Sequence, residues 1–179
     1  MIYNENKDAT GNNNKNMEDA LNALGYKEIK EVADKVEDKA PYCLAYKTVV
    51  LDGKKTNILC VVVRGTYKKE WIDNFDSGYG ESTHKGFLRG ADFVYNGICN
   101  YVKDNKLSDG KLKILITGHS RGAAVANLLG AKIDDNSLKN SNFSVSISNK
   151  DVFVYTFATP NTTSIKERDD QKYNNIYNI

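Results

Sequence analysis

The sequence predicts an α/β protein in which helices flank a mostly parallel central sheet. An amphipathic segment with helical spacing covers residues 87–102, and an Ala- and Leu-rich segment that predicts a buried helix covers residues 120–133. Between and around them lie short apolar segments of the kind found in strands that are buried on both faces, at residues 57–63, 111–117 and 151–158. Strands that alternate with helices in this way are typical of a parallel sheet. Residues 175–179 would begin one more strand.

Local signals predict the remaining elements. Apolar residues recur at helical spacing from Met17 to Leu24, and Gly25 is a typical helix stop. A second, weaker helix is expected at residues 29–36, ended by Pro41. The Asp52-Gly53 turn predicts a hairpin between a strand at 42–51 and the strand at 57–63. Three further expectations are a flexible lead-in at 1–16, a domain at 17–179, and a polar stretch at 134–150 with a short edge strand at 143–147.

Length and composition limit the classes of function. The 179 residues suit one domain with its own core, and the net charge of +2 is too small to favour nucleic acid as a partner. No apolar run is long enough for a transmembrane helix, and the polar N-terminus lacks the apolar core of a signal peptide. The protein therefore stays inside the cell or has been trimmed. Cys43, Cys60 and Cys99 are widely spaced and are expected to be small buried apolar residues.

The segment Gly118-His119-Ser120-Arg121-Gly122 fits the G-x-S-x-G pattern of a nucleophile elbow. It lies between a predicted buried strand and a predicted helix, which is the setting that such an elbow requires. Flanking glycines allow the tight turn, and the helix N-terminus favours negative charge at the serine. The alternative is that Ser120 only caps the helix, since serine is a preferred N-cap residue.

A second feature lies at the carboxyl end of the preceding buried strand, in Arg64-Gly65-Thr66. That end of a strand is the functional edge of an open α/β sheet. An oxyanion hole needs two backbone amides, and those of Thr66 and Arg121 are suitably placed along the chain. Alternatively, Arg64 pairs with a carboxylate and Gly65 only turns the chain.

Several motifs in order resemble the class 3 lipases, a family of α/β-hydrolases that includes the fungal triacylglycerol lipases. The similarity extends from about Tyr42 to the end of the chain. The segments that carry it are Arg64-Gly65-Thr66, Glu70-Trp71-Ile72-Asp73-Asn74-Phe75, His84-Lys85-Gly86-Phe87, Thr117-Gly118-His119-Ser120-Arg121-Gly122-Ala123 and Tyr155-Thr156-Phe157-Ala158-Thr159-Pro160.

The resemblance implies a role for most of these residues. Ser120 would be the nucleophile, and Thr66 and Arg121 would supply the oxyanion amides. Residues 70–75 match the lid helix of the lipases, with an apolar lid face formed by Trp71, Ile72 and Phe75. The short loop that follows argues against a large lid, and ordinary partial burial explains Trp71 equally well. Arg121 replaces a common leucine and could pair with Asp73 or Asp76, or favour an acidic or polar ester.

The resemblance also implies that the catalytic acid and base lie beyond Ile179, so the hydrolase domain would be incomplete at its C-terminus. This fold orders its triad as Ser, acid, His, and no histidine follows Ser120. His84 precedes the serine and matches a family histidine that is not the base. His119 is expected to be packed and hydrogen-bonded, pointing away from Ser120. The acidic residues after Ser120 are expected to be solvated, namely Asp134, Asp135, Asp151, Glu167, Asp169 and Asp170.

These observations predict a serine carboxylic-ester hydrolase that acts on an ester or lipid through an acyl-enzyme on Ser120. Neither a cofactor nor a metal is expected, because phosphate-loop, dinucleotide and zinc-ligand patterns are missing from the sequence. Without its acid and base the chain would be weak or inactive. The alternatives are a non-catalytic hydrolase-like domain that binds a lipid or a protein, and an acyltransferase or thioesterase. The last strand would expose an apolar sheet edge through which the chain self-associates.

Overall fold

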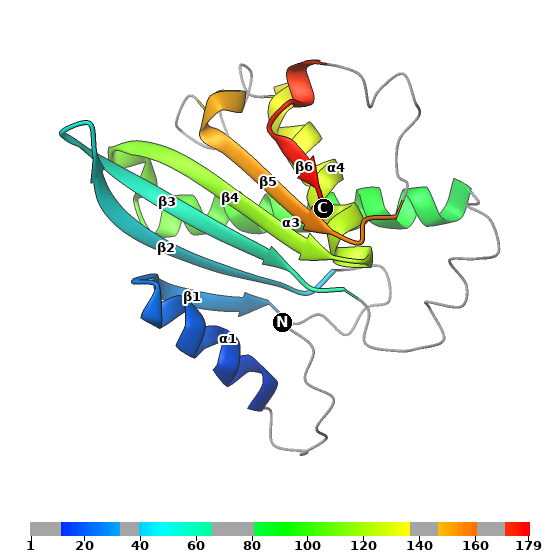
Figure 1. Ribbon diagram of the computed structural model, residues 1–179, viewed down its shortest axis with the longest axis horizontal. Helices are drawn as coiled ribbons and strands as arrows, with labels where there is room; N and C mark the ends of the chain where they lie inside the picture. Colours follow the sequence, from blue (N-terminus) through cyan, green and yellow to red (C-terminus); the bar gives the residue numbers. More distant parts are fainter. Residues whose placement is uncertain (1–11, 33–39, 66–80, 137–146, 161–170) are drawn as a thin grey trace.

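In the part of the chain that the structure describes, a six-stranded mixed sheet in the order β1-β2-β3-β4-β5-β6 forms the centre (Figure 1). The computed structural model describes residues 12–32, 40–65, 81–136, 147–160 and 171–179. Within these residues, three short 3₁₀ turns, η1, η3 and η4, cover 107–109, 149–151 and 171–173. The helices and strands are α1 (Asn12–Ala23), β1 (Lys27–Val32), β2 (Tyr42–Leu51), β3 (Lys54–Val63), α3 (Glu81–Asp104), β4 (Lys111–His119), α4 (Arg121–Asn136), β5 (Val152–Phe157) and β6 (Ile176–Asn178).

The strands pair in two modes. β1, β2 and β3 are joined by antiparallel ladders, whereas β3–β4, β4–β5 and β5–β6 are parallel. The β2–β3 hairpin turns at Asp52 and Gly53, whose φ values of 51° and 72° are both positive. Two positive φ values are what a two-residue hairpin turn with the right twist demands. The predicted turn and the parallel part of the sheet are confirmed.

The main core lies between one face of the sheet and the helices α3 and α4. It contains fully buried strand residues such as Leu59, Ile114 and Val154, and fully buried helix residues such as Val94 and Leu129. A smaller cluster on the opposite face joins α1 and β1 to Cys43, Ala45 and Cys60. In Figure 1, α3 and α4 accordingly lie behind the sheet, and α1 lies beside β1, below it in this view.

One predicted element is wrong. Residues 27–32 form the strand β1, where a helix was expected from residue 29. Ile29 and Val32 are three positions apart, as on a helix, but backbone pairing with β2 determines the structure here. Glu28 has a φ of 52° at a shift of register, and the Tyr101 hydroxyl donates a hydrogen bond of 2.6 Å to its carbonyl. Residues 33–36 of the predicted helix lie outside the described residues.

Element boundaries differ at several other points. α1 begins at Asn12, inside the expected lead-in, and α3 begins at Glu81, so His84 lies within the helix and not before it. α4 continues to Asn136, into the expected polar stretch. The proposed lid at 70–75 and edge strand at 143–147 lie outside the described residues. No helix in the described segments is long and apolar enough to cross a membrane.

The core packing predicts a clear contrast between two strand residues. Ile114→Ala should lower the free energy of unfolding by about 2–5 kcal/mol, because Ile114 is fully buried and truncation leaves a cavity. Val50→Ala, at an exposed position of β2, should change it by less than about 0.5 kcal/mol. Urea unfolding measures both changes, and equal losses would contradict the core described above.

Candidate active site

The site is built around Ser120, the single residue between the end of β4 and the start of α4. Its φ is 54°, in the left-handed region that non-glycine residues rarely adopt. Its amide donates a hydrogen bond of 3.0 Å to the carbonyl of Phe157, at the end of β5. Its carbonyl accepts hydrogen bonds from the amides of Ala123 (2.9 Å) and Ala124 (3.1 Å), in the first turn of α4. A conventional N-cap residue has extended backbone angles, so this conformation differs from that of a simple serine cap.

Two glycines permit the close approach of strand and helix at Ser120. A Cβ on Gly118 would lie 2.5 Å from the carbonyl carbon of Gly122 and 2.9 Å from the amide nitrogen of Ala123. A Cβ on Gly122 would meet the carbonyl oxygen of Val63, and would lie 2.9 Å from the amide nitrogen of Gly65. The contacting atoms are backbone, which cannot rotate away. Both positions therefore require glycine, as the elbow pattern predicts.

These contacts also bring the end of β3 to the elbow. Gly65 is buried and lies against the first turn of α4, where Arg121 is the first helical residue. Arg64 is exposed, and its amide donates a hydrogen bond of 2.9 Å to the carbonyl of Pro41. Thr66 follows directly but lies outside the described residues, as do Trp71, Ile72 and Phe75. Of the two expected oxyanion donors, only Arg121 lies within the described residues.

A polar network links α4, β5 and β6 just below the elbow. The fully buried Thr156 hydroxyl lies 2.7 Å from Asn178 Oδ1 and 3.1 Å from Asn127 Oδ1. Asn127 Nδ2 donates to the same Asn178 oxygen at 2.7 Å, and the Thr159 hydroxyl donates to that of Thr156 at 2.9 Å. These bonds fix the register of β6 relative to the helix that carries the elbow. No local sequence pattern predicts this network, because its members come from three separate segments of the chain.

His119 does not have the packed position expected for it. The residue is exposed, at the end of β4, where its register partner is Phe157. Alternate residues of β4 face opposite sides of the sheet, and His119 falls on the side away from α3 and α4. That side carries no helix over the end of β4 among the described elements, which explains the exposure. For His84 the structure places only the backbone, in the first turn of α3.

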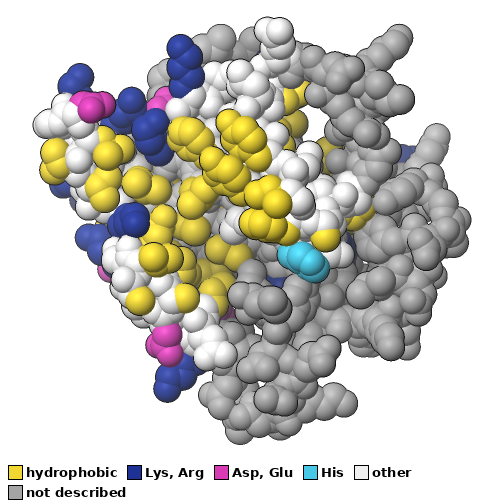
Figure 2. All heavy atoms as spheres, in the orientation of Figure 1, with side chains coloured by type: hydrophobic (Ala, Val, Ile, Leu, Met, Phe, Trp, Pro, Cys, Tyr) yellow, Lys and Arg dark blue, Asp and Glu magenta, His cyan; other side chains and the backbone are white. Residues whose placement is uncertain are grey.

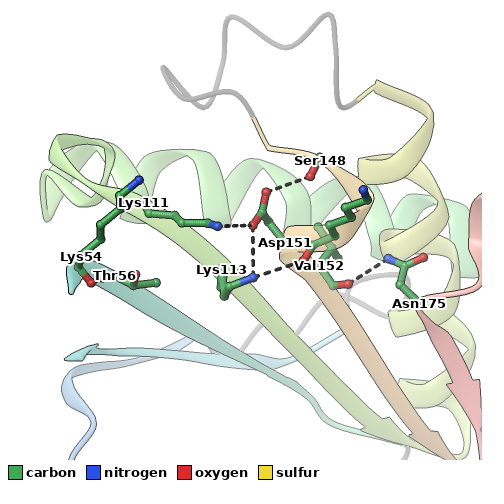
Figure 3. A network of polar contacts seen from close by, with 9 residues as sticks. Lys54, Thr56, Lys111, Lys113, Ser148, Asp151, Val152 and Asn175 are labelled. Carbon is green, nitrogen blue, oxygen red and sulfur yellow. Dashed lines mark hydrogen bonds and ion pairs between the residues drawn. The ribbon is translucent and has the colours of Figure 1, made fainter. Parts of the chain in front are cut away.

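The sequence predicted that Asp151 is a solvated charge, and this prediction is wrong. It lies just before β5, where Lys113 Nζ is 3.2 Å and Lys111 Nζ 3.7 Å from Oδ1, and the Ser148 hydroxyl donates to Oδ2 at 2.9 Å (Figure 3). Although burial acts to raise it, the hydrogen bonds from Ser148 and Lys113 hold the pKa of Asp151 below its ordinary value. The carboxylate lies at the amino ends of the parallel strands, about 20 Å along β4 from Ser120. It is too far away to act on the serine.

Asp134 also differs from the solvated charge that was expected. It lies near the end of α4, half-buried, where Asn175 Nδ2 donates to Oδ1 at 3.3 Å. Burial raises its pKa from 3.8 to about 6, against the effect of that hydrogen bond. Its neighbour Asp135 is exposed and pairs with Lys172 at 2.8 Å. Both lie about 20 Å along α4 from Ser120. Glu167, Asp169 and Asp170 lie outside the described residues.

The cysteines have environments that suppress thiol chemistry. Burial raises the pKa of the Cys43 thiol to about 12 and that of Cys60 to about 11. Cys99 is partly buried, and burial raises its pKa as well. Thiols with such pKa values stay protonated at neutral pH and are poor nucleophiles and metal ligands.

Comparison with known proteins adds the family. The profile of the family described as Lipase (class 3) matches residues 52–179, which include the hairpin, the elbow and β6. The chain belongs to the class 3 lipase family. A search of curated protein sequences found no match.

Solved structures of lipases are similar to this chain at low sequence identity, and that of M37 lipase shows its fold. M37 lipase is 16% identical, with a TM-score of 0.57 over 93% of this chain and 58% of that protein. The lipase of Rhizomucor miehei in its propeptide complex is 22% identical, with a TM-score of 0.45 over 74% of this chain and 42% of that one. Lip2 lipase of Yarrowia lipolytica is 21% identical, with a TM-score of 0.46 over 78% and 48%. This class 3 lipase chain thus spans about half the length of the lipases that it matches.

The close contact at the elbow predicts opposite effects for two glycine substitutions in helices. Gly122→Ala should destabilise the protein by about 1–3 kcal/mol or more, because its Cβ would overlap backbone atoms of residues 63–65. Gly86→Ala, in α3, has no atom within 4 Å of the added Cβ and should stabilise by about 0.5–1 kcal/mol. Thermal unfolding followed by circular dichroism distinguishes the two, and a neutral Gly122→Ala would refute the contact.

The pKa of Asp134 predicts a pH-dependent effect. Between about pH 4 and pH 6 the folded state holds a proton that the unfolded state has lost, so the stability falls as the pH rises through this window. The Asp134→Asn variant has no carboxyl group at this position, so it avoids this fall in stability. It should be nearly neutral at pH 4 and should stabilise at pH 8 by about 1–2 kcal/mol, allowing for solvent screening at a half-buried site.

Asp151→Asn is the matched control with the opposite sign. A lowered pKa contributes stability above the ordinary pKa of the carboxyl group and loses it as the pH falls. This variant should therefore be destabilised at pH 8 and close to the unchanged protein near pH 3. Urea unfolding across this pH range tests both variants. If Asp134→Asn stabilised the protein at pH 4 but not at pH 8, the raised pKa of Asp134 would be contradicted.

Proposed function

We propose that this class 3 lipase chain carries the nucleophile of a serine carboxylic-ester hydrolase, with Ser120 as the attacking residue. The observation that carries the proposal is the backbone of Ser120, held at a φ of 54° between a parallel strand and a helix. This strained strand-turn-helix is the form in which α/β-hydrolases expose a nucleophile. The conformation is costly for a serine, and a simple helix cap would not need it.

The chemistry would be acyl transfer through Ser120. The Oγ attacks the ester carbonyl while a base takes its proton, the alcohol leaves with a proton, and water then hydrolyses the acyl-enzyme. The amide of Arg121, at the start of α4, is one donor for the oxyanion. The amide of Thr66 is the second donor in this proposal, because Gly65 is held directly beside the first turn of α4. The substrate class is an ester or lipid.

We further propose that the chain by itself is a weak catalyst. Asp134, Asp135 and Asp151, which follow Ser120 and lie within the described residues, are about 20 Å from it and serve structural contacts. His119 is the last residue of β4 and falls on the side of the sheet away from α3 and α4, and Ser120 follows it in the turn, outside the strand. A serine without a base is a poor nucleophile, and most of the rate is lost.

Reactivity of Ser120 with a fluorophosphonate probe tests this proposal. We expect slow modification of Ser120, detected by peptide mass spectrometry, and acceleration by about tenfold or more when imidazole is added as an external base. Ser120→Ala should lose the modification, whereas Ser148→Ala, at a serine bound to Asp151, should keep it. Hydrolysis of a short nitrophenyl ester should be equally slow for Ser120→Ala and the unchanged chain.

Two outcomes would contradict the proposal in different ways. If the fluorophosphonate probe modified Ser120→Ala as much as the unchanged chain, Ser120 would not be the nucleophile. That result would favour the alternative of a lipid- or protein-binding domain. The exposed aromatic residues Tyr155, Phe157 and Tyr177 support that alternative. Turnover that depends on Ser120 at the rate of ordinary esterases would instead show that the chain has its own base.

A further inference from the structure

The β2–β3 hairpin projects beyond the rest of the sheet at the amino ends of the parallel strands (Figure 1). Its ladder continues to the pair Leu51–Lys54, whereas β4 begins only at Lys111, which lies opposite Thr56. β1 pairs with the other half of β2. Among the described strands, the last pairs of the hairpin therefore have no neighbour on either side.

Hydrogen bonds of the buried Asn57 hold the hairpin in this position. The Thr48 hydroxyl donates to Asn57 Oδ1 at 2.8 Å, and Asn57 Nδ2 donates to the carbonyl of Leu107 at 3.1 Å. These bonds connect both strands of the hairpin to the η1 turn that precedes β4. The hairpin end is thus ordered before it meets a partner, which lowers the entropic cost of binding.

The hairpin end carries apolar side chains on one strand and lysines on the other. Val50 is 72% and Leu51 40% exposed at the end of β2. Their register partners on β3 are Lys55 and Lys54, and both of these are exposed. Because alternate residues of a strand face opposite sides, each face of the hairpin end combines one apolar side chain with one lysine. Figure 2 shows basic and apolar side chains together at this end, at the upper left.

Lysines also gather on the neighbouring strands at this end of the sheet. Lys111 and Lys113 share one carboxylate, that of Asp151, at 3.7 Å and 3.2 Å (Figure 3). Lys54 and Lys55 form no ion pair with any residue of the described segments. Basic residues outnumber acidic ones at the ends of these strands, with Lys54, Lys55, Lys111, Lys113 and Lys150 against Asp52, Asp109 and Asp151. This end of the sheet is therefore positively charged.

The charge of the hairpin end determines what it can contact. An ammonium group is costly to bury unless a carboxylate or another anion lies beside it. Lys54 and Lys55 accordingly require either water or an anionic partner. Exposed apolar residues next to lysines suit an anionic lipid surface in particular. There the apolar side chains enter the boundary of the acyl chains, while the lysine stems extend and keep the ammonium groups among the headgroups.

We propose that the hairpin end docks on an anionic lipid surface. Val50 and Leu51 insert at the boundary of the acyl chains, and Lys54, Lys55 and Lys111 contact the anionic headgroups. Each lysine near such a surface adds to the electrostatic attraction, and the apolar residues supply a part of the binding that salt does not screen. A lipid surface is favoured over an acidic protein because the apolar residues lie at the projecting tip, which a flat surface reaches first.

This orientation places Ser120 on the side of the molecule away from the lipid. Lys111 and Ser120 lie at opposite ends of β4, about 30 Å apart along the strand. The hairpin end would therefore tether the protein, and an ester would reach Ser120 from the aqueous phase. Because docking involves no reaction at Ser120, the proposal does not depend on the function proposed above.

Co-sedimentation with lipid vesicles tests the electrostatic part of the proposal. We expect the chain to bind phosphatidylcholine vesicles that contain about 30% phosphatidylserine at least about tenfold more tightly than pure phosphatidylcholine vesicles. Lys54→Gln combined with Lys55→Gln should weaken binding to the anionic vesicles by about tenfold or more. Lys15→Gln combined with Lys30→Gln removes the same charge from exposed residues of α1 and β1, and should change binding by less than about twofold.

A second pair of variants tests insertion of the tip. Val50→Ser should weaken binding to the anionic vesicles by about fivefold or more, and this loss should persist in high salt, where the effect of the lysines is screened. Leu88→Ser, at a residue of α3 that is 41% exposed, is the matched control and should leave binding unchanged. Ser120→Ala should bind as tightly as the unchanged chain.

Circular dichroism verifies that each variant keeps the fold. Equal binding to neutral and anionic vesicles, or an equal loss in the Lys15 and Lys30 control, would overturn the proposal. Sensitivity to the Lys54 and Lys55 changes without sensitivity to Val50→Ser would indicate an acidic protein partner in place of lipid. A loss of binding in Ser120→Ala would show that the vesicles bind at the elbow, and would also overturn the proposal.

Discussion

The first turn of α4 packs directly on the carboxyl ends of β3 and β4, and this contact is possible only because Gly118 and Gly122 lack side chains. The contact forces the chain to reverse within one residue, which leaves Ser120 with a positive φ. It also brings Gly65 against the start of the helix. The geometry of the elbow is therefore a consequence of backbone packing, which places Ser120 directly after the carboxyl end of β4.

Hydrogen bonds below the elbow extend this constraint to the last two strands. Ser120 donates to Phe157, and Asn127 in α4 joins Thr156 and Asn178. At the other end of α4, Asp134 accepts a hydrogen bond from Asn175. α4, which begins directly after Ser120, thus holds both ends of β6, through Asn178 and through Asn175, the residue before the strand. The ion pairs at the amino ends of the strands, around Asp151, complete the opposite edge and take no part in the site.

Much of the fold could be predicted from local patterns. Continuous apolar segments, helical spacing and the Asp52-Gly53 turn identified β2 to β6 and the three helices of the described residues, with errors of up to about six residues at their ends. β1 could not be predicted, because Ile29 and Val32 have helical spacing and only pairing with β2 makes the segment a strand. For single side chains, the clearest errors of prediction concern two acidic residues that were expected to be solvated. Asp134 and Asp151 are polar in sequence, but their burial depends on Asn175, Lys113 and Ser148, which lie far away along the chain.

The sequence by itself determined the elbow and the family, because both depend on short runs of residues whose chemistry is local. The order G-x-S-x-G between an apolar strand and a small-residue helix allows few other structures. The tertiary structure alone decided which groups approach Ser120 and which do not, because distance in space is set by the pairing and packing of separate segments. It also decided that residues 27–32 form a strand, because this depends on pairing with β2, and no single segment of sequence carries that information.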